Sequence, residues 1–546
     1  MIQFPMQIPI QEIGEGSKLF MDYVSGGDTP ATSILGGFQR GNSRWEEVIS
    51  QSAHASDVGK QSWENLIERL GEYNHSVGVD GQVLDKLREA KDGGVRFVVT
   101  GQQPGVLGGS LLTLYKVMTA IAVSDHVERT FNVPCVPLHW VGADDVDFQE
   151  IRELFLVDCD LTPLSTAVAH DAYQAALPVG DIAAQAIRDV WEAVEPLVSR
   201  CPHGEYVSGI VDDALDGATD HGVVTARIIA ALTGGRVALI DGRDPAVRVH
   251  GRELFLRFFD QEERVRELVA ASGRSLEEDG YHAQLWLGPD SGVFMVEEGR
   301  RKKIVDEKRQ DVRAHLAEDV GRFSPGVALR NLVQDSVFRP VAAVLGPAEI
   351  AYRAQLDQVY DAMDVGRPVA FPRMQATYLS PPIEALLSSL EALGNREVVQ
   401  LHANPTAFVK SIYASQHSDK IKAAEEHFKR AFRAGTDEFI KSIDGTLDQK
   451  TVEKSKRRLA DVSRRLEQVL DVTEDAGRTA SLKRWPFLGA LGDYLRRKDK
   501  MQDRYLSLLT PFLFSGADGY QSLTAATNAF VEGALDGNVP FVVYSA

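Results

Sequence analysis

A glycine-rich stretch, residues 101–109 (GQQPGVLGG), follows a short β-branched run at residues 95–100. Glycines at a strand-to-helix turn allow close backbone approach and leave amide N–H groups for an anion. Gln102 and Gln103 add amide groups that orient a hydroxyl or a carboxylate. The stretch matches neither the Walker pattern nor the dinucleotide fingerprint. It therefore indicates a phosphate or carboxylate site or, alternatively, a tight turn without a ligand.

Three acids, Asp144, Asp145 and Asp147, follow a second apolar run at residues 133–141. Acids so close together raise one another's pKa, bind an amine or sugar hydroxyls, or hold a magnesium ion. The alternative is a solvated or helix-capping turn, which is the commoner use of such residues. His139, in the preceding strand, is more typical of a satisfied core histidine than of a base.

A third polar turn begins at Gly346, where Pro347 suits the first position of a helix. Glu349 in the first turn either complements the helix dipole or, with Tyr352, presents a polar face to a cleft. Arg330, Gln334 and Arg373 supply further donors for an anionic substrate, although an arginine is usually an ion-pair partner. The pair Cys201 and His203 lacks the further ligands of a zinc site, so we expect no structural metal.

Five short apolar runs bring these turns together. They are residues 95–100, 133–141, 236–241, 341–346 and 368–372, and a helical pattern at 110–128 separates the first two. Repeated alternation of strands and helices predicts a Rossmann-like, doubly wound and mainly parallel α/β sheet. Ligands in such folds bind beyond the carboxyl ends of the strands, where the polar turns converge.

We predict four segments along the chain. Residues 1–90 form a helical N-terminal cover, 91–382 the Rossmann-like core, 383–474 an antiparallel coiled-coil hairpin, and 475–546 a segment packed on the core. The hairpin rests on two apolar stripes joined by a turn at residues 444–448: Ile421, Phe428, Phe432, Phe439 and Ile443 on one helix, and Val452, Leu459, Val462, Leu466 and Val469 on the other. Because these stripes have no strand partners, we expect the hairpin to make a homodimer.

The composition excludes several classes of protein. The 546 residues carry a formal charge of −19, which disfavours extended nucleic acid as a partner. No run approaches the roughly 18 apolar residues of a membrane span, and the opening residues have no basic leader. Three cysteines suit a reducing compartment better than a disulfide framework, so we expect the cytoplasm.

A series of short motifs resembles the bacillithiol biosynthesis cysteine-adding enzymes, the cysteine ligase family, in the family's order over most of the chain. The series comprises residues 98–105 (VVTGQQPG), 114–116 (LYK), 137–140 (PLHW), 144–148 (DDVDF), 281–284 (YHAQ), 323–325 (FSP), Arg330, 334–335 (QD), 346–352 (GPAEIAY), 355–356 (QL) and 502–504 (QDR). Two positions depart from the family pattern: Val146 stands where a histidine is usual, and Asp503 where a glutamate is more frequent. A catalytic histidine in the acidic loop is therefore not expected.

The resemblance implies a ligase that adds L-cysteine to the glucosamine amine of glucosaminyl-malate, with a coiled coil used in dimerisation. It assigns catalysis to Asp145, Asp147 and Glu349. It assigns substrate or nucleotide binding to Thr100, Gly101, Gln102, Gln103, Gly105, Lys116, Asp144, Gln284, Arg330, Gln334, Gly346, Tyr352 and Arg373. In this interpretation the glycine-rich loop and Lys116 hold an anionic group, and the acidic loop orients the acceptor amine or sugar. Glu349 and Arg373 complete the cleft.

ATP or ADP is the expected nucleotide, because a free carboxylate does not condense with an amine in water without activation. The family core resembles that of class I aminoacyl-tRNA synthetases, but neither their His-Ile-Gly-His nor their Lys-Met-Ser-Lys-Ser signature occurs here. Two other classes remain as alternatives: a nucleotide-binding protein without catalysis, and a coiled-coil interaction scaffold. Polar turns at several strand ends favour the enzyme over the scaffold.

Overall fold

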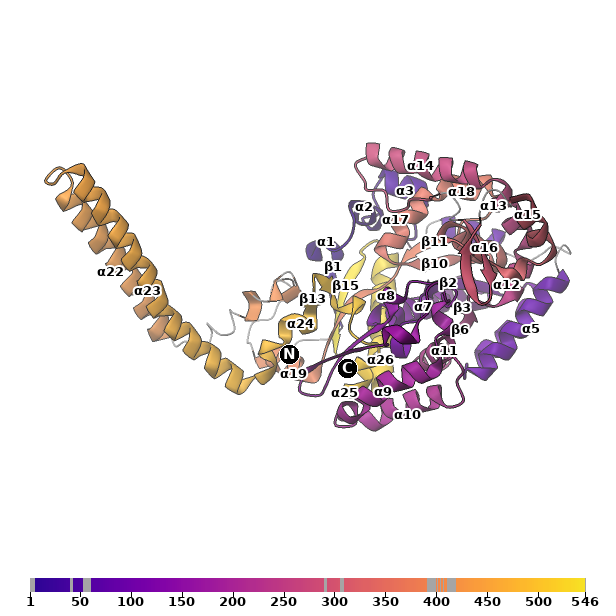
Figure 1. The fold of residues 1–546 in the computed structure, drawn as a ribbon, viewed down its shortest axis with the longest axis horizontal. Coiled ribbons are helices and arrows are strands. Elements are labelled where there is room, and N and C mark those ends of the chain that lie inside the picture. Colours follow the sequence, from indigo (N-terminus) through magenta and orange to yellow (C-terminus); the bar gives the residue numbers. More distant parts are fainter. Residues whose placement is uncertain are drawn as a thin grey trace. The chain divides into compact units, whose positions relative to one another are not determined.

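The computed structural model describes residues 5–39, 43–52, 60–288, 292–304, 309–389, 399, 401–402, 404–405, 407–409 and 419–545. The chain folds into two compact units (Figure 1). The first comprises Met1–Cys159, Pro163–Ser388 and Lys500–Ala546, and the second comprises Asp160–Thr162 and Ser389–Asp499.

A five-stranded parallel sheet lies at the centre of the first unit. Its order is β11-β10-β2-β3-β6, with β2 (Arg96–Gln102), β3 (Cys135–Val141), β6 (Ala238–Asp241), β10 (Ala342–Leu345) and β11 (Val369–Pro372). The side chains of β3 and β10 are buried throughout, as expected for a sheet covered on both faces. The prediction of a Rossmann-like α/β fold is confirmed, and each of the five predicted apolar runs overlaps one of these strands.

The order of the strands creates a switch point between β2 and β10. From β2 the chain runs through α7 (Leu111–Phe131) to β3 and then outward to β6, before it returns to β10 on the other side of β2. Helix α7 contacts both β2 and β3 on one side and α26 (Asp518–Leu535) on another, which explains why it is apolar around most of its circumference (Figure 1). Ligand sites form beyond the carboxyl ends of the strands at such a switch point.

A second sheet, which the sequence analysis did not predict, joins the two ends of the chain. Strand β15 (Pro540–Ser545) pairs antiparallel with β1 (Met6–Pro9) and parallel with β12 (Gln375–Leu379). After β1, the described residues up to 90 are mainly helical. These helices are α1 (Ile10–Ile13), α2 (Lys18–Val24), α3 (Pro30–Leu35), α4 (Ser43–Gln51), α5 (Lys60–Ser76) and α6 (Gly81–Glu89).

The remaining elements of the first unit surround these two sheets. Two smaller antiparallel sheets pair β4 (Glu153–Val157) with β5 (Pro163–Ala167), and β7 (Val293–Glu297) with both β8 (Arg300–Lys303) and β9 (Phe323–Pro325). The helices are α8 (Phe148–Ile151), α9 (Ala184–Val198), α10 (Gly204–Leu215), α11 (His221–Leu232), α12 (Pro245–His250), α13 (Arg252–Asp260), α14 (Glu262–Glu278), α15 (Arg309–Glu318), α16 (Val327–Phe338), α17 (Pro347–Gln355), α18 (Asp357–Ala362), α19 (Pro381–Ser389), the 3-10 helix η8 (Gln502–Arg504) and α25 (Thr510–Ser515). Among the described residues no helix is both long and apolar enough to span a membrane.

A buried cluster fixes α16 against α17 and α18. The Oδ2 atom of Asp335 accepts hydrogen bonds from Tyr360 Oη at 2.6 Å and from Arg353 Nη1. All three side chains are buried, so the loss of Asp335 would leave the Arg353 guanidinium without its counter-charge inside the protein. The cluster thereby sets the positions of the polar side chains that α16 and α17 carry.

The second unit contains two long helices, α22 (Asp419–Ile443) and α23 (Gln449–Arg484), which contact each other. Val452 is buried and Leu459 and Leu466 are half-buried, whereas Phe428, Phe439 and Val462 are exposed. The predicted stripes therefore do not lie entirely between the two helices. The side chains of Ile421 and Val469 fall outside the described part, and the coiled coil stays a prediction.

Candidate functional site

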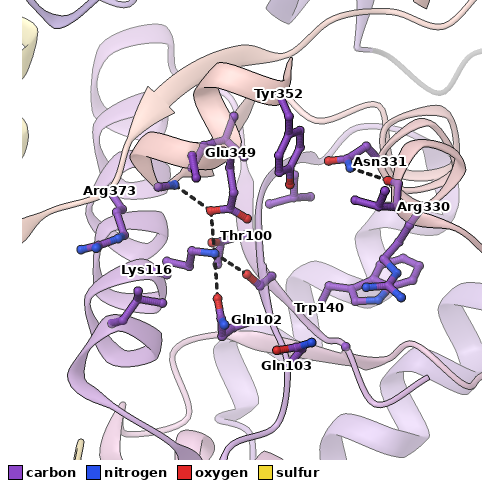
Figure 2. A pocket seen from close by; sticks show the side chains of 18 of the residues that line it. Thr100, Gln102, Gln103, Lys116, Trp140, Arg330, Asn331, Glu349, Tyr352 and Arg373 are labelled. Carbon is purple, nitrogen blue, oxygen red and sulfur yellow. Dashed lines mark hydrogen bonds and ion pairs between the residues drawn. The ribbon is translucent and has the colours of Figure 1, made fainter. Parts of the chain in front are cut away.

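A cavity of about 360 Å³ lies at the carboxyl ends of β2, β3 and β10, next to the switch point between β2 and β10 (Figure 2). Its polar lining comes from these strand ends and from α7, α8, α16, α17 and η8. The lining residues are Val99, Thr100, Gly101, Gln102, Gln103, Leu112, Lys116, Trp140, Gly142, Asp145, Glu150, Val327, Arg330, Asn331, Gln334, Leu345, Gly346, Pro347, Ala348, Glu349, Tyr352, Arg373 and Arg504. Ten of the predicted binding residues and two of the predicted catalytic residues thus meet at one place.

The second half of the glycine-rich loop uses its amide groups within the loop itself. The N–H groups of Gly108 and Gly109 donate to the carbonyl oxygens of Gly105 and Val106, at 3.0 and 3.1 Å. Gly105 does not line the cavity, and a β-carbon on it would lie 2.5 Å from Gly109 Cα. Glycine at position 105 is therefore required by the loop's own backbone. The structure thus gives Gly105 a role in the loop's backbone, and its predicted role in ligand binding stays a prediction.

Lys116 is buried on α7, and all three of its ammonium hydrogens have acceptors. Its Nζ atom lies 2.7 Å from Glu349 Oε2, 2.7 Å from the Gly101 carbonyl oxygen and 3.0 Å from Gln102 Oε1 (Figure 2). Burial lowers the pKa of Lys116, while the Glu349 carboxylate opposes that shift. An ammonium has only three hydrogens to donate, so Lys116 has none left for an anion. In this structure it holds Glu349 and the end of β2 in place, and its role as a ligand of a bound anion stays a prediction.

Glu349 lies in the first turn of α17 and points its carboxylate into the cavity. Its Oε2 atom accepts a hydrogen bond from the Gly346 N–H at 2.7 Å in addition to the Lys116 contact. Among the described residues no hydrogen bond or ion pair to Oε1 is found. One oxygen is therefore anchored and the other faces the cavity, which is the arrangement that a positioned proton acceptor requires.

Asp145 and Glu150 form the acidic side of the cavity. Asp145 Oδ2 lies 3.3 Å from Arg330 Nη1, and Asp145 Oδ1 accepts a hydrogen bond from the Val146 N–H at 2.7 Å. Burial raises the pKa of Asp145, but Arg330 and the hydrogen bonds from Gln103 and Val146 outweigh this effect and lower it. Burial together with the neighbouring acids raises the pKa of Glu150. The two carboxyl groups therefore differ in acidity, as the acid and base of an active site commonly do.

The other two predicted acids serve the structure of the loop. Asp144 is buried: its Oδ2 accepts from Ser324 Oγ at 3.2 Å, and its Oδ1 lies 3.7 Å from Arg330 Nη2. Asp147 lies outside the cavity and caps α8 by accepting the Glu150 N–H at 3.2 Å. In this structure Asp147 therefore caps a helix outside the cavity lining, and its catalytic role stays a prediction. No group of three or more His, Cys, Asp or Glu side chains in the described part of the chain is placed to hold a metal ion.

Of the remaining predicted residues, most line the cavity and one does not. Arg330, Gln334, Gly346, Tyr352 and Arg373 line the cavity, and Thr100 also donates its hydroxyl to the Val344 carbonyl oxygen at 2.9 Å. Gln284 does not line it; its N–H donates to Gln355 Oε1 at 2.6 Å, which ties the loop that carries it to α17. The backbone of Gln284 thus supports α17, and the binding role of its side chain stays a prediction.

The structure adds four polar residues that were not among the predicted site residues: Trp140, Glu150, Asn331 and Arg504. Trp140 and Arg504 belong to the motif series, but neither residue type alone indicates a site. Glu150 follows Asp147 by one helical turn, a spacing that would have identified it once α8 was known. His139 lies in β3, and burial followed by the nearby Lys116 lowers its pKa to about 3. It is therefore neutral at physiological pH, as expected for a core histidine.

A family model described as "Bacillithiol biosynthesis BshC, N-terminal Rossmann-like domain" matches residues 6–374. The chain belongs to the BshC family. The matched region contains every residue that lines the cavity except Arg504. The prediction of the family, and with it of an enzyme of the ligase class, is confirmed.

Curated relatives named "Putative cysteine ligase BshC" align with most of the chain. The protein from Natranaerobius thermophilus is 26% identical over 396 residues, covering 69% of this chain and 72% of its own length. The protein from Salinibacter ruber is 28% identical over 399 residues, covering 69% of this chain and 71% of its own length. The protein from Prosthecochloris aestuarii is 26% identical over 492 residues, covering 82% and 84%.

Among solved structures, a Mycobacterium tuberculosis methionyl-tRNA synthetase in complex with methionyl-adenylate covers 81% of this chain and 91% of its own. The TM-score is 0.24 and the identity 10%, which is too little to support an argument about fold or nucleotide.

Proposed function

We propose that this BshC protein is the ligase that joins the carboxyl group of L-cysteine to the amine of glucosaminyl-malate, in the cytoplasm, to form bacillithiol. The observation that carries the proposal is the cavity at the switch point, where carboxylates and guanidinium groups face each other across a small volume. An acceptor with one amine and two carboxylates needs both kinds of partner. A zwitterionic amino acid needs them as well.

In this proposal the acceptor nitrogen forms a bond to the cysteine carboxyl carbon and loses a proton, while one carbon–oxygen bond of that carboxyl group breaks. The oxygen leaves on the activating group where ATP is consumed, and as water where it is not. Glu349 Oε1 takes that proton, because Oε2 is anchored by Lys116 and Gly346. Asp145, kept ionised by Arg330, hydrogen-bonds to the amine or to sugar hydroxyls.

ATP is the proposed activating co-substrate. The amides of Gly108 and Gly109 are used within the loop and are not free for a polyphosphate, and we derive no step through the nucleotide.

Reconstitution with the purified protein tests this function. We expect cysteine and glucosaminyl-malate to yield bacillithiol, identified by mass spectrometry, in a reaction that depends on the protein. Parallel reactions with and without ATP show whether the nucleotide is consumed. Cells that lack the protein should accumulate glucosaminyl-malate and contain no bacillithiol.

The two alternative classes give different outcomes. A nucleotide-binding protein without catalysis would bind ADP in calorimetry but yield no product under any condition. An interaction scaffold would bind neither substrate, and its deletion would leave the cellular thiol pool unchanged. Either pattern would contradict the ligase assignment.

We also propose that the protein is a homodimer through α22 and α23. Phe428, Phe439 and Val462 are 46–48% exposed on these helices, and exposed aromatic side chains on a long helix are typical of an interface. The double variant Phe428→Glu/Phe439→Glu should halve the mass measured by light scattering at micromolar concentration. A matched pair of polar changes on the same helix, Glu426→Gln/Glu438→Gln, should leave it unchanged. A wild-type protein with the mass of one chain would contradict the dimer.

A further inference from the structure

Arg373, directly after β11, has a buried guanidinium group whose Nε and Nη2 atoms form an edge without protein partners in the described part of the chain. It is 2% exposed, its Nη1 atom lies 2.7 Å from Asp503 Oδ2, and Nη1 also donates to the Met374 carbonyl oxygen at 2.7 Å. Its Nε atom has no hydrogen-bond partner among the described residues, and no contact of Nη2 is found there either. A buried donor without a partner is costly, so an unused edge at a cavity wall indicates a missing ligand.

Arg504, in η8, places a second guanidinium on the same wall. It is exposed, lines the cavity, and has no ion pair or hydrogen bond among the residues that the structure describes. Its charge acts on Lys116, whose pKa it lowers together with Arg373 after the larger effect of burial. The two guanidinium groups therefore lie near the same buried ammonium. Because η8 comes from the end of the chain, the site is complete only when this segment packs against the Rossmann-like core.

The charges at this side of the cavity do not cancel. Three cations, Lys116, Arg373 and Arg504, face two carboxylates, Glu349 and Asp503, which leaves one net positive charge. Lys116 is paired with Glu349 and Arg373 with Asp503, so the unbalanced charge resides on Arg504, next to the partly used guanidinium of Arg373. One anionic group of a ligand would balance it.

We infer that Arg373 and Arg504 form a carboxylate subsite, which takes the malyl end of the acceptor. The adjacent Nε and Nη2 hydrogens of a guanidinium match the two oxygens of a planar carboxylate. Free phosphate or a nucleotide phosphate shares this oxyanion chemistry. However, the neighbouring Glu349 and Asp503 and a single net positive charge favour a singly charged group.

The position of Gly346 supports this assignment, which rests on the proposed function. A β-carbon on Gly346 would lie 3.2 Å from Glu349 Oε2 and 3.5 Å from Arg373 Nε, so one small gap separates the proton acceptor from the subsite. In a glucosaminyl glycoside the amine and the aglycone occupy adjacent ring carbons. A carboxylate held by Arg373 therefore brings the amine towards Glu349.

Calorimetry on the full-length protein tests the subsite with L-malate as the probe. We expect Arg504→Gln to weaken malate binding about tenfold or more, because a charge-assisted hydrogen bond is lost. In turnover assays the same change should raise KM for glucosaminyl-malate by a similar factor and leave kcat and the KM for cysteine nearly unchanged. Arg129→Gln, an exposed arginine in the last turn of α7, is the matched control and should alter none of these values.

A second variant and two further probes define the outcomes. Arg373→Lys keeps a positive charge beside Asp503 but removes the adjacent Nε and Nη2 donors. It should therefore also weaken malate binding. Thermal unfolding should show that this variant is folded. Unchanged malate binding in both variants would overturn the subsite. So would weakened binding of inorganic phosphate or ADP with malate binding intact, since that pattern assigns a phosphate site. Malate binding that depends on Arg504 in a protein without ligase activity would support the subsite and reject the proposed function.

Discussion

Replacement of Glu349 by glutamine is expected to lower kcat by about 10²–10⁴-fold, the usual contribution of a positioned proton acceptor. The amide keeps the shape of the side chain and accepts hydrogen bonds from Lys116 and from the Gly346 N–H, but it cannot take a proton from the acceptor amine. KM for both substrates should change little, because Oε2 is occupied by protein donors. Steady-state kinetics on the purified variant measures the effect.

The variant also leaves the buried Lys116 without its counter-charge. We therefore expect a lower free energy of unfolding, because a buried charge that loses its partner is strongly destabilising. A double variant, Lys116→Met/Glu349→Leu, removes both charges and should recover part of the lost stability without recovering turnover. If turnover returned together with stability, Glu349 would be a structural residue and the proposed chemistry would be wrong.

The central sheet was predictable because each of its strands can be recognised from its local sequence pattern. Each strand is a short, buried, mainly apolar run that ends in polar or glycine residues, and the regular spacing of helices between the runs indicates parallel connections. The polar side chains at the ends of β2, β3 and β10 were expected to converge for the same reason. Thr100, Gln103 and Glu349 meet in the cavity as expected.

Residues whose role depends on a distant partner were not predictable in the same way. The pairing of β1 with β15 joins opposite ends of the chain, and neither strand shows which partner it will find. Arg504 reaches the cavity because η8 is held there by two distant contacts. Gln502 bonds to both the N–H and the carbonyl oxygen of Tyr378, at 2.8 and 3.1 Å, and Asp503 pairs with Arg373.

Local geometry also gave two kinds of residue a structural use. The glycines of the 101–109 loop suggested free amide groups, but the loop forms a 3-10 turn that uses two of them, and Gly108 and Gly109 adopt positive φ angles of 88° and 92°. Asp147 is chemically identical to Asp145, yet it lies at the N-terminus of α8 and caps it. Sequence spacing placed both acids in one loop and gave no information on which of them faces the cavity.

Because Asp145 faces the cavity and Asp147 does not, we expect the second large effect, on KM for the acceptor, at Asp145. Asp145→Asn is expected to raise KM for glucosaminyl-malate by about 10–100-fold, because a charge-assisted hydrogen bond to the amine or sugar is lost. Arg330 would then keep only the more distant Asp144, at 3.7 Å, as an acidic partner. Kinetics with each substrate in turn measures the change, and KM for the acceptor should respond most.

The pH dependence of the free energy of unfolding tests independently whether Asp145 is ionised in the folded protein. Arg330 and the hydrogen bonds to Asp145 outweigh burial and hold its pKa below the usual value, so the ionised carboxylate stabilises the folded protein above the unfolded pKa. That contribution is lost as the pH falls through the lower folded pKa. Wild type and Asp145→Asn should therefore differ most in free energy of unfolding at neutral pH and approach each other in acid.

Asp147→Asn is the matched control, because asparagine caps a helix about as well as aspartate. We expect its KM and kcat to stay within about twofold of wild type, since the side chain lies outside the cavity and keeps its acceptor for the Glu150 N–H. Equal losses in the two variants would mean that the loop acts through its net charge alone. Negligible losses in both would assign the acids to a structural turn and leave the acceptor amine without a partner on this side of the cavity.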